Sequence, residues 1–170
     1  MTAVLFICTG NAARSVMAGV ALRELRPDVS VDTAGTMVVD GTPLSWRTRA
    51  ALDAVGLPLP RHVSQQATQA HLAVADVVVA MAPEHVTWVS RQHPSALSKT
   101  ATLRHLVDAL PPSSRGPDTV LAQRLSALDL AHRPLDLAEE ITDPGGGEVD
   151  AFVACAQEVL VLVQKLAVIL

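Results

Sequence analysis

The chain has 170 residues, a formal net charge of −4 and a hydrophobic fraction of 49%. This length suits a single domain over 1–170 with a sizeable core. Aromatic residues make up only 2%, and no basic block is interleaved with them, which argues against a nucleic-acid partner. Two cysteines are too few for a disulfide framework, and the N-terminus has no basic leader, so we expect a cytoplasmic protein.

Apolar runs separated by turn residues predict an alternation of strands and helices. The run 75–81 is apolar on both faces, which is typical of a parallel sheet covered by helices on each side. Alternation of this kind predicts an α/β fold, a three-layer α/β/α domain with a four-stranded parallel sheet. The expected elements are strands at 3–8, 29–34, 75–81 and 101–103, and helices at 14–25, 45–55, 84–92, 118–130 and 148–169.

Two segments follow this pattern less clearly. The variable segment at about 105–140 contains 111–117, which is a loop by composition. The C-terminal stretch 159–170 is apolar, but Gln164 and Lys165 interrupt it, and it is too short and too polar to span a membrane. We expect a buried closing helix and no membrane partner; the alternative is an exposed apolar face that forms a homodimer.

The most informative motif joins the first strand to the following helix: Cys8-Thr9-Gly10-Asn11-Ala12-Ala13-Arg14-Ser15. At such a turn the backbone N–H groups and the positive end of the helix face an oxyanion. Arg14 adds a planar fork that matches phosphate oxygens. The same positive field favours the nucleophilic thiolate of Cys8. The motif therefore predicts a cysteine-based phosphate site; the alternative is a buried apolar cysteine near a solvated arginine.

A second motif supplies a carboxyl group. A thiolate that attacks phosphorus expels a leaving group, which needs a proton from a positioned acid. Asp143, followed by Pro144 and three glycines, is the candidate acid. Without the Cys8 motif, the same residues would indicate an ordinary turn into a helix.

Together these segments resemble the low-molecular-weight protein tyrosine phosphatase family, whose Cys-x5-Arg-Ser loop follows the first strand and whose Asp-Pro loop lies near the C-terminus. Thr33-Ala34-Gly35-Thr36 and Arg61-His62-Val63-Ser64-Gln65 match two further segments. The resemblance covers most of the chain except about 105–140. It implies a phosphotyrosine phosphatase I-like fold and hydrolysis of a phosphomonoester, either phosphotyrosine or a related phosphorylated protein residue.

The resemblance also implies residue roles. Cys8 would be the nucleophile and form a phosphocysteine, Arg14 would stabilise the transition state, and Asp143 would act as general acid and then as general base. Ser15 would donate to the Cys8 thiolate, and Asn11 would brace the loop in a left-handed conformation. No metal or cofactor is needed, and the partner is a phosphorylated protein or a small phosphoester. The implied phosphate-binding residues are Thr9, Gly10, Asn11, Ala12, Ala13, Arg14 and Ser15.

The chain departs from the family pattern at several positions. Ala13 replaces a second loop cysteine, Gly19 replaces a glutamate that would tie His62, and Ala82 replaces a supporting carboxylate. Aromatic residues that grip a phenyl ring are missing. The glycines after Asp143 resemble the branch acting on phosphoarginine, although Ala12 stands where that branch carries a threonine. Phosphatase chemistry is therefore better supported than phosphotyrosine as the substrate.

Two alternative functions remain open from the sequence. A thiol-dependent arsenate reductase would use the same loop but needs thiols that carry electrons; beyond Cys8 there is only Cys155, which we expect to be buried and inert. A catalytically weak phosphate-binding or interaction protein is the other alternative.

Several further residues receive structural interpretations. Trp46 and Trp88 lie on expected helices and are expected to be core or packing residues rather than base-stacking ones. Arg47 and Arg49 are expected on a solvated helix face, with a basic rim for acidic substrates as the alternative. His85 has no metal-ligand spacing, like the other histidines, and is expected to be solvated or satisfied.

Overall fold

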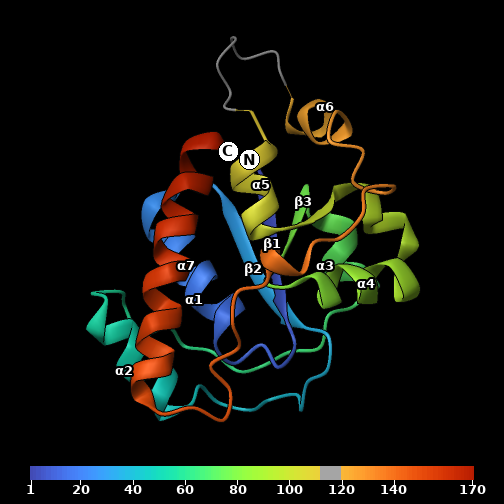
Figure 1. Ribbon diagram of the computed structural model, residues 1–170. Coiled ribbons are helices and arrows are strands. Elements are labelled where there is room, and N and C mark those ends of the chain that lie inside the picture. Colours follow the sequence, from blue (N-terminus) through green and yellow to red (C-terminus); the bar gives the residue numbers. More distant parts are fainter. Residues whose placement is uncertain (112–119) are drawn as a thin grey trace.

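The computed structural model describes residues 1–111 and 120–170, which form a parallel sheet between helices (Figure 1). Within these residues the sheet has four strands in the order β2-β1-β3-β4, and all neighbouring strands pair in parallel. The predicted fold class is therefore confirmed. The strands are β1 (Ala3–Cys8), β2 (Ser30–Gly35), β3 (Val77–Ala80) and β4 (Thr100–Thr102).

The helices follow the expected alternation, with two additions. The short helices α3 and α5 are not predicted by the sequence pattern, whereas α1, α2, α4 and α7 begin and end within a residue or two of the predicted bounds. The helices are α1 (Arg14–Leu25), α2 (Trp46–Ala54), α3 (Gln69–Val74), α4 (Pro83–Gln92), α5 (Leu103–Ala109), α6 (Leu121–Ser126) and α7 (Val149–Ile169). Two 3-10 turns, Pro94–Lys99 and Leu137–Glu139, complete the order.

The helix predicted over 118–130 is wrong in its extent. Helix α6 ends at Ser126, and turns follow over 127–132. Within them Asp129 has a φ of 46°, which is left-handed and incompatible with a continuing helix. Residues 118 and 119 lie outside the described residues. So does most of the loop predicted at 111–117.

Side chains of β1 alternate between the two layers of helices. Val4, Phe6 and Cys8 belong to a core shared with residues of α1, α2, α5 and α7, whereas Leu5 and Ile7 belong to a core shared with residues of α3 and α4. Figure 1 shows α1, α2 and α7 on one side of the sheet and α3 and α4 on the other. Burial on both faces explains why β1 and β3 are apolar throughout.

Helix α7 closes the first of these layers, as predicted. By length and composition alone it is the one helix in the described residues that could cross a membrane. It packs against α1, α2 and α5, and its buried residues recur at helical spacing along one face, among them Phe152, Cys155, Val159 and Leu166. Such a stripe is typical of a core helix.

The carboxyl edge of the sheet gathers segments that are far apart in sequence. The Cys8 carbonyl at the end of β1 accepts from Thr36 N–H at 2.9 Å, beyond the end of β2. The Met81 carbonyl beyond β3 accepts from Ile141 N–H at 2.9 Å. This second bond brings the segment before Asp143 to the edge where the Cys8 loop begins.

Candidate active site

The loop between β1 and α1 has the backbone of an oxyanion cradle. Helix α1 begins at Arg14 without a side-chain cap and without an acidic residue in its first turn. Within the described residues, no hydrogen-bond partner is found for the N–H groups of Gly10, Asn11, Ala12 and Ala13. Unpaired N–H groups next to the positive end of a helix favour a bound anion.

A chain of hydrogen bonds orients the hydroxyl of Ser15 toward Cys8. The Asn11 side-chain oxygen accepts from Gln65 N–H at 3.1 Å, which fixes the orientation of the amide and leaves its NH₂ to donate to Ser15 Oγ at 3.0 Å. Ser15 Oγ lies 3.0 Å from Cys8 Sγ. Because Ser15 Oγ accepts from Asn11 and its proton has no other acceptor among the described residues, the hydroxyl is available to donate to the sulfur.

Asn11 also holds the loop in its unusual conformation. Its φ of 50° lies in the left-handed region, as predicted, and its carbonyl accepts from Ser64 Oγ at 2.9 Å and lies 2.7 Å from His62 Nε2. With glycine at position 19 no side chain there reaches His62, and His62 contacts the loop through the Asn11 carbonyl instead. A Cβ on Gly19 would lie 2.5 Å from Thr33 Cγ2 against β2, and His62 reaches the loop without help from position 19.

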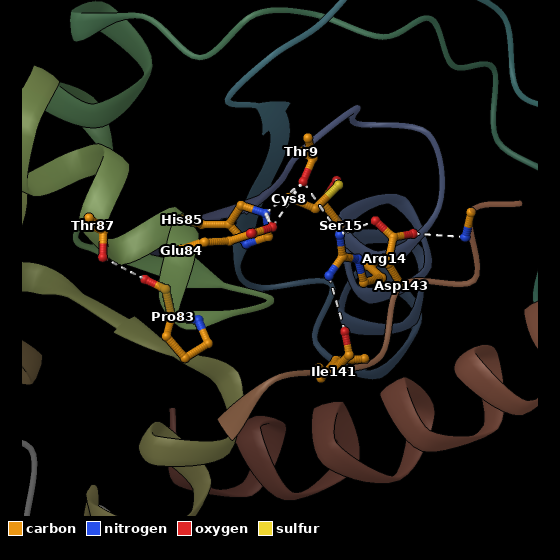
Figure 2. A network of polar contacts seen from close by, with 11 residues as sticks. Cys8, Thr9, Arg14, Ser15, Pro83, Glu84, His85, Thr87, Ile141 and Asp143 are labelled. Carbon is orange, nitrogen blue, oxygen red and sulfur yellow. Dashed lines mark hydrogen bonds and ion pairs between the residues drawn. The ribbon is translucent and has the colours of Figure 1, made fainter. Parts of the chain in front are cut away.

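Arg14 joins the Cys8 loop to the Asp143 loop. Its side chain is only 3% exposed; Nη1 donates to the Ile141 carbonyl at 3.1 Å, and Nη2 lies 2.5 Å from Asp143 Oδ2. Asp143 is half-exposed, and its other oxygen accepts from Gly145 N–H at 2.9 Å. Figure 2 shows Arg14 between Ile141 and Asp143 and close to Cys8. The two motifs predicted from sequence are therefore brought together.

These residues line one cavity of about 360 Å³. Cys8, Arg14 and Asp143 line it together with the apolar side chains of Ala12 and Phe152. The N-terminal end of α2 forms another part of the wall, where Thr48 Oγ1 donates to the Ala12 carbonyl at 2.9 Å. The cavity is much larger than a phosphoryl group, so it also accommodates the group attached to the phosphorus.

His85 is a site residue that the sequence analysis missed. It is buried at the start of α4, and its Nε2 lies 3.0 Å from Thr9 Oγ1 and 3.4 Å from Glu84 Oε1 (Figure 2). Thr9 Oγ1 in turn accepts from Arg14 Nη2 at 3.5 Å. Burial, reinforced by the charge of Arg14, lowers the pKa of His85 to about 4, so the imidazole is neutral near pH 7. The sequence offered one sign of this role. His85 follows the third strand closely, and the carboxyl end of that strand lies at the same sheet edge as Cys8.

The residues around α2 correct two structural interpretations. Trp46 is not a core residue, because it is 60% exposed, and its ring instead lies under the Arg47 guanidinium at 5.0 Å from the centroid. Arg47 lines the cavity, whereas Arg49 is exposed on the same helix. Arg47 therefore belongs to the rim of the cavity and not to a purely solvated face.

Cys155 is buried inside α7, as expected. Desolvation raises the pKa of its thiol to about 12, although the Arg14 charge opposes this shift. A thiol of this kind does not exchange electrons readily at neutral pH.

These features together define a class of protein. The first strand of a parallel sheet ends in a cysteine, an uncapped helix follows it, and a buried arginine of that helix faces an aspartate. This is the architecture of a cysteine-dependent enzyme that handles phosphate at the carboxyl edge of a sheet.

Comparisons with known proteins identify the family. A family model of low molecular weight phosphotyrosine protein phosphatase matches residues 3–114. A protein-arginine-phosphatase from Geobacillus stearothermophilus is 29% identical over 96% of this chain and 93% of its own length. The solved structure of the YwlE arginine phosphatase from the same organism superposes with a TM-score of 0.76 over 98% of this chain and 91% of that one, at 28% identity. A probable low molecular weight protein-tyrosine-phosphatase, EpsP, from Ralstonia solanacearum is 32% identical over 54% of this chain and 63% of its own length.

The chain belongs to the low molecular weight phosphotyrosine protein phosphatase family. The recognition and fold class drawn from the sequence are thus confirmed, and the chain is a cysteine-dependent phosphatase. The matched residues 3–114 contain the Cys8 loop but not Asp143.

Proposed function

We propose that this protein removes the phosphoryl group from a phosphorylated protein residue, with Cys8 as nucleophile, Arg14 as phosphoryl-binding residue and Asp143 as general acid. The observation that carries the proposal is the convergence of these three side chains in one cavity, with Arg14 Nη2 2.5 Å from Asp143 Oδ2. The buried chain from Gln65 through Asn11 and Ser15 supports a thiolate at Cys8.

The first chemical step forms a sulfur–phosphorus bond. The Cys8 thiolate attacks phosphorus while the loop N–H groups and the Arg14 guanidinium bind the non-bridging oxygens. The bond from phosphorus to the leaving oxygen or nitrogen breaks, and protonated Asp143 donates its proton to that atom. Asp143 suits this role because it is half-exposed at the cavity edge, where the leaving group departs.

The second step hydrolyses the phosphocysteine. Asp143, now a carboxylate, accepts a proton from a water molecule that attacks phosphorus, and the sulfur–phosphorus bond breaks to regenerate the Cys8 thiolate and release phosphate. Ser15 stabilises the returning charge on sulfur through the hydroxyl that lies 3.0 Å away. No electron is transferred in either step, so no reductant is consumed.

Phosphoarginine is the substrate that we propose first, ahead of phosphotyrosine. The relative that matches 96% of this chain carries the name protein-arginine-phosphatase, and its match reaches the Asp143 region. Within the described residues the cavity wall offers one aromatic side chain, Phe152, and that residue is buried. A half-exposed carboxylate such as Asp143 suits a departing guanidinium group, which is a cation with several N–H donors.

The cysteines bear on the compartment and on the alternative chemistries considered from the sequence. Two free cysteines suit the reducing cytoplasm, which we propose as the working compartment. The raised pKa and burial of Cys155 weigh against its use as an electron-carrying thiol for arsenate reduction. The convergence of Cys8, Arg14 and Asp143 weighs against a protein that only binds phosphate.

The deciding experiment measures turnover of a substrate panel by the wild type and two variants. The panel contains phosphoarginine, phosphotyrosine and phosphoserine peptides, para-nitrophenyl phosphate, and arsenate with a thiol reductant. Cys8→Ser should abolish turnover and retain oxyanion binding. Asp143→Asn should lower kcat roughly a hundredfold for poor leaving groups and far less for nitrophenolate, which leaves without a proton.

Three outcomes would contradict the proposal. Residual turnover above background in Cys8→Ser would remove Cys8 as the nucleophile. Equal slowing of all substrates by Asp143→Asn would make Asp143 structural. Turnover of arsenate with thiol, in the absence of phosphatase activity, would favour the reductase.

A further inference from the structure

The cavity carries two arginines in the described part of the chain, and they are used differently. Arg14 is buried and already has three acceptors: Asp143, the Ile141 carbonyl and Thr9. Arg47 is about one-third exposed and lines the same cavity, where α2 begins. The proposed phosphoryl chemistry involves Arg14 and assigns no role to Arg47.

Arg47 is held in position without a strong counter-ion. Its guanidinium stacks over the Trp46 ring at 5.0 Å, and its Nε is buried and has no hydrogen-bond partner among the described residues. The nearest carboxylate is Glu148, at 3.8 Å and with a side chain that is 85% exposed. A contact this long to a solvated carboxylate neutralises only part of the positive charge, and a better-placed carboxylate can replace it.

We propose that Arg47 binds a second anionic group of the substrate, a carboxylate from an acidic residue next to the phosphorylated residue of a peptide. This inference rests on the proposed function, since it places the phosphoryl group on Arg14 and the loop. Stacking on Trp46 orients the planar fork of Arg47, and a planar fork pairs well with a carboxylate. Glu148 occupies part of that position in the free protein and competes with the substrate carboxylate.

The competition gives two variants with opposite expected effects. Arg47→Gln removes the cation and should reduce the preference for an acidic neighbour. Glu148→Gln removes the competing carboxylate and should increase that preference. Arg49→Gln is the matched control, because Arg49 lies exposed on the same helix and is absent from the cavity wall.

The test uses two peptides that carry the phosphorylated residue that the wild type hydrolyses fastest. They differ only in the residue next to it, which is Glu in one peptide and Gln in the other. The readout is the ratio of kcat/KM for the Glu peptide to that for the Gln peptide, at low and at high salt. We expect a wild-type ratio of about three to five at low salt, falling as salt screens the pair. The ratio should approach one in Arg47→Gln, rise above the wild type in Glu148→Gln, and stay at the wild-type value in Arg49→Gln.

Failure of this inference and failure of the proposed function give different results. A wild-type ratio of one, with both peptides hydrolysed, overturns the role of Arg47 alone, and so does an equal loss of preference in Arg49→Gln. Absence of hydrolysis of every phosphorylated compound overturns both. If Arg47→Gln unfolds, the increase expected in Glu148→Gln still decides the question.

Discussion

His85 is a residue whose burial has a thermodynamic consequence. Its side chain is 1% exposed, and burial lowers its pKa from 6.5 to about 4, with Arg14 lowering it further and Asp143 opposing. A histidine with a depressed native pKa binds its proton more readily in the unfolded chain. Stability contributed by neutral His85 is therefore complete above pH 6.5 and is lost as the pH falls toward about 4.

We expect His85→Gln to flatten the fall in stability at acidic pH. The pKa difference corresponds to a loss of at most about 3 kcal/mol in the free energy of unfolding between neutral pH and pH 4. His105 adds to the same slope in the wild type, because burial lowers its pKa as well. Urea unfolding followed at several pH values between 4.5 and 7.5 measures the slope in both proteins.

The control for this prediction is Gln92→Asn, an exposed substitution on the same helix that changes no ionisable group. A slope in His85→Gln as steep as that of the wild type would show that His85 is not the buried neutral group. The sequence could not give this result, because a lone histidine on a helix has the same pattern whether it is buried or solvated.

At the scale of elements, the packing of α1 on β2 depends on the absence of a side chain at Gly19. A Cβ there would lie 2.5 Å from Thr33 Cγ2, closer than such atoms approach in folded proteins. Alanine in place of glycine improves helix propensity by about 1 kcal/mol, whereas overpacking a rigid core costs typically 1–3 kcal/mol. The clash is relieved only by rotating the buried Thr33 side chain or by moving the helix off the strand, so the cost of overpacking exceeds the gain.

We therefore expect Gly19→Ala to lower the free energy of unfolding by about 1 kcal/mol, measured by urea unfolding. Thr33→Ser removes the Cγ2 methyl and keeps the hydroxyl, so the double variant should recover most of the loss. Thermodynamic coupling between the two positions is the critical observation. A double variant whose effect is the sum of the single ones would contradict the direct clash.

The elements that could be predicted are those with strong local signals. Strand β1 is a continuous apolar run, Ser45 caps α2 by accepting from Thr48 N–H, and α1 ends before Pro27. Helices α3 and α5 have six and seven residues, too few for a helical repeat to be visible. They are stabilised by burying Leu72 and Leu106 in the core, which is tertiary information.

At the scale of the molecule, the site depends on contacts that span most of the chain. The pattern of residues 8–15 predicts the oxyanion loop because its whole geometry is local. The pairing of Arg14 with Asp143 crosses 129 positions. The need for an acid at the Cys8 loop and the resemblance to a family predicted that the two motifs act together, but neither predicted this direct contact. Thr9 and His85 are 76 positions apart, and neither a motif nor the resemblance linked them.

In the free protein Asp143 contacts the Arg14 guanidinium, so an incoming oxyanion has to compete with Asp143 for it. An incoming anion takes up the Arg14 guanidinium, which Asp143 contacts at 2.5 Å in its absence. An anion that binds only the folded state stabilises it by about 2.7 kcal/mol at a hundred times its Kd. For a chain of this size that corresponds to a rise in Tm of roughly 5–10 °C.

We expect vanadate and phosphate to raise the Tm of the wild type, and to raise that of Asp143→Asn further at the same concentration, because the neutral amide neither competes for Arg14 nor repels the anion. Arg14→Lys should show a much smaller rise, since an ammonium group lacks the planar fork that binds two oxygens. Thermal unfolding in each anion, with chloride at matched ionic strength as control, measures these shifts.

Equal shifts in the wild type and Asp143→Asn would show that Asp143 does not hold Arg14 in the free protein. Equal shifts with chloride would show that the anion acts through ionic strength and not at the Cys8 loop.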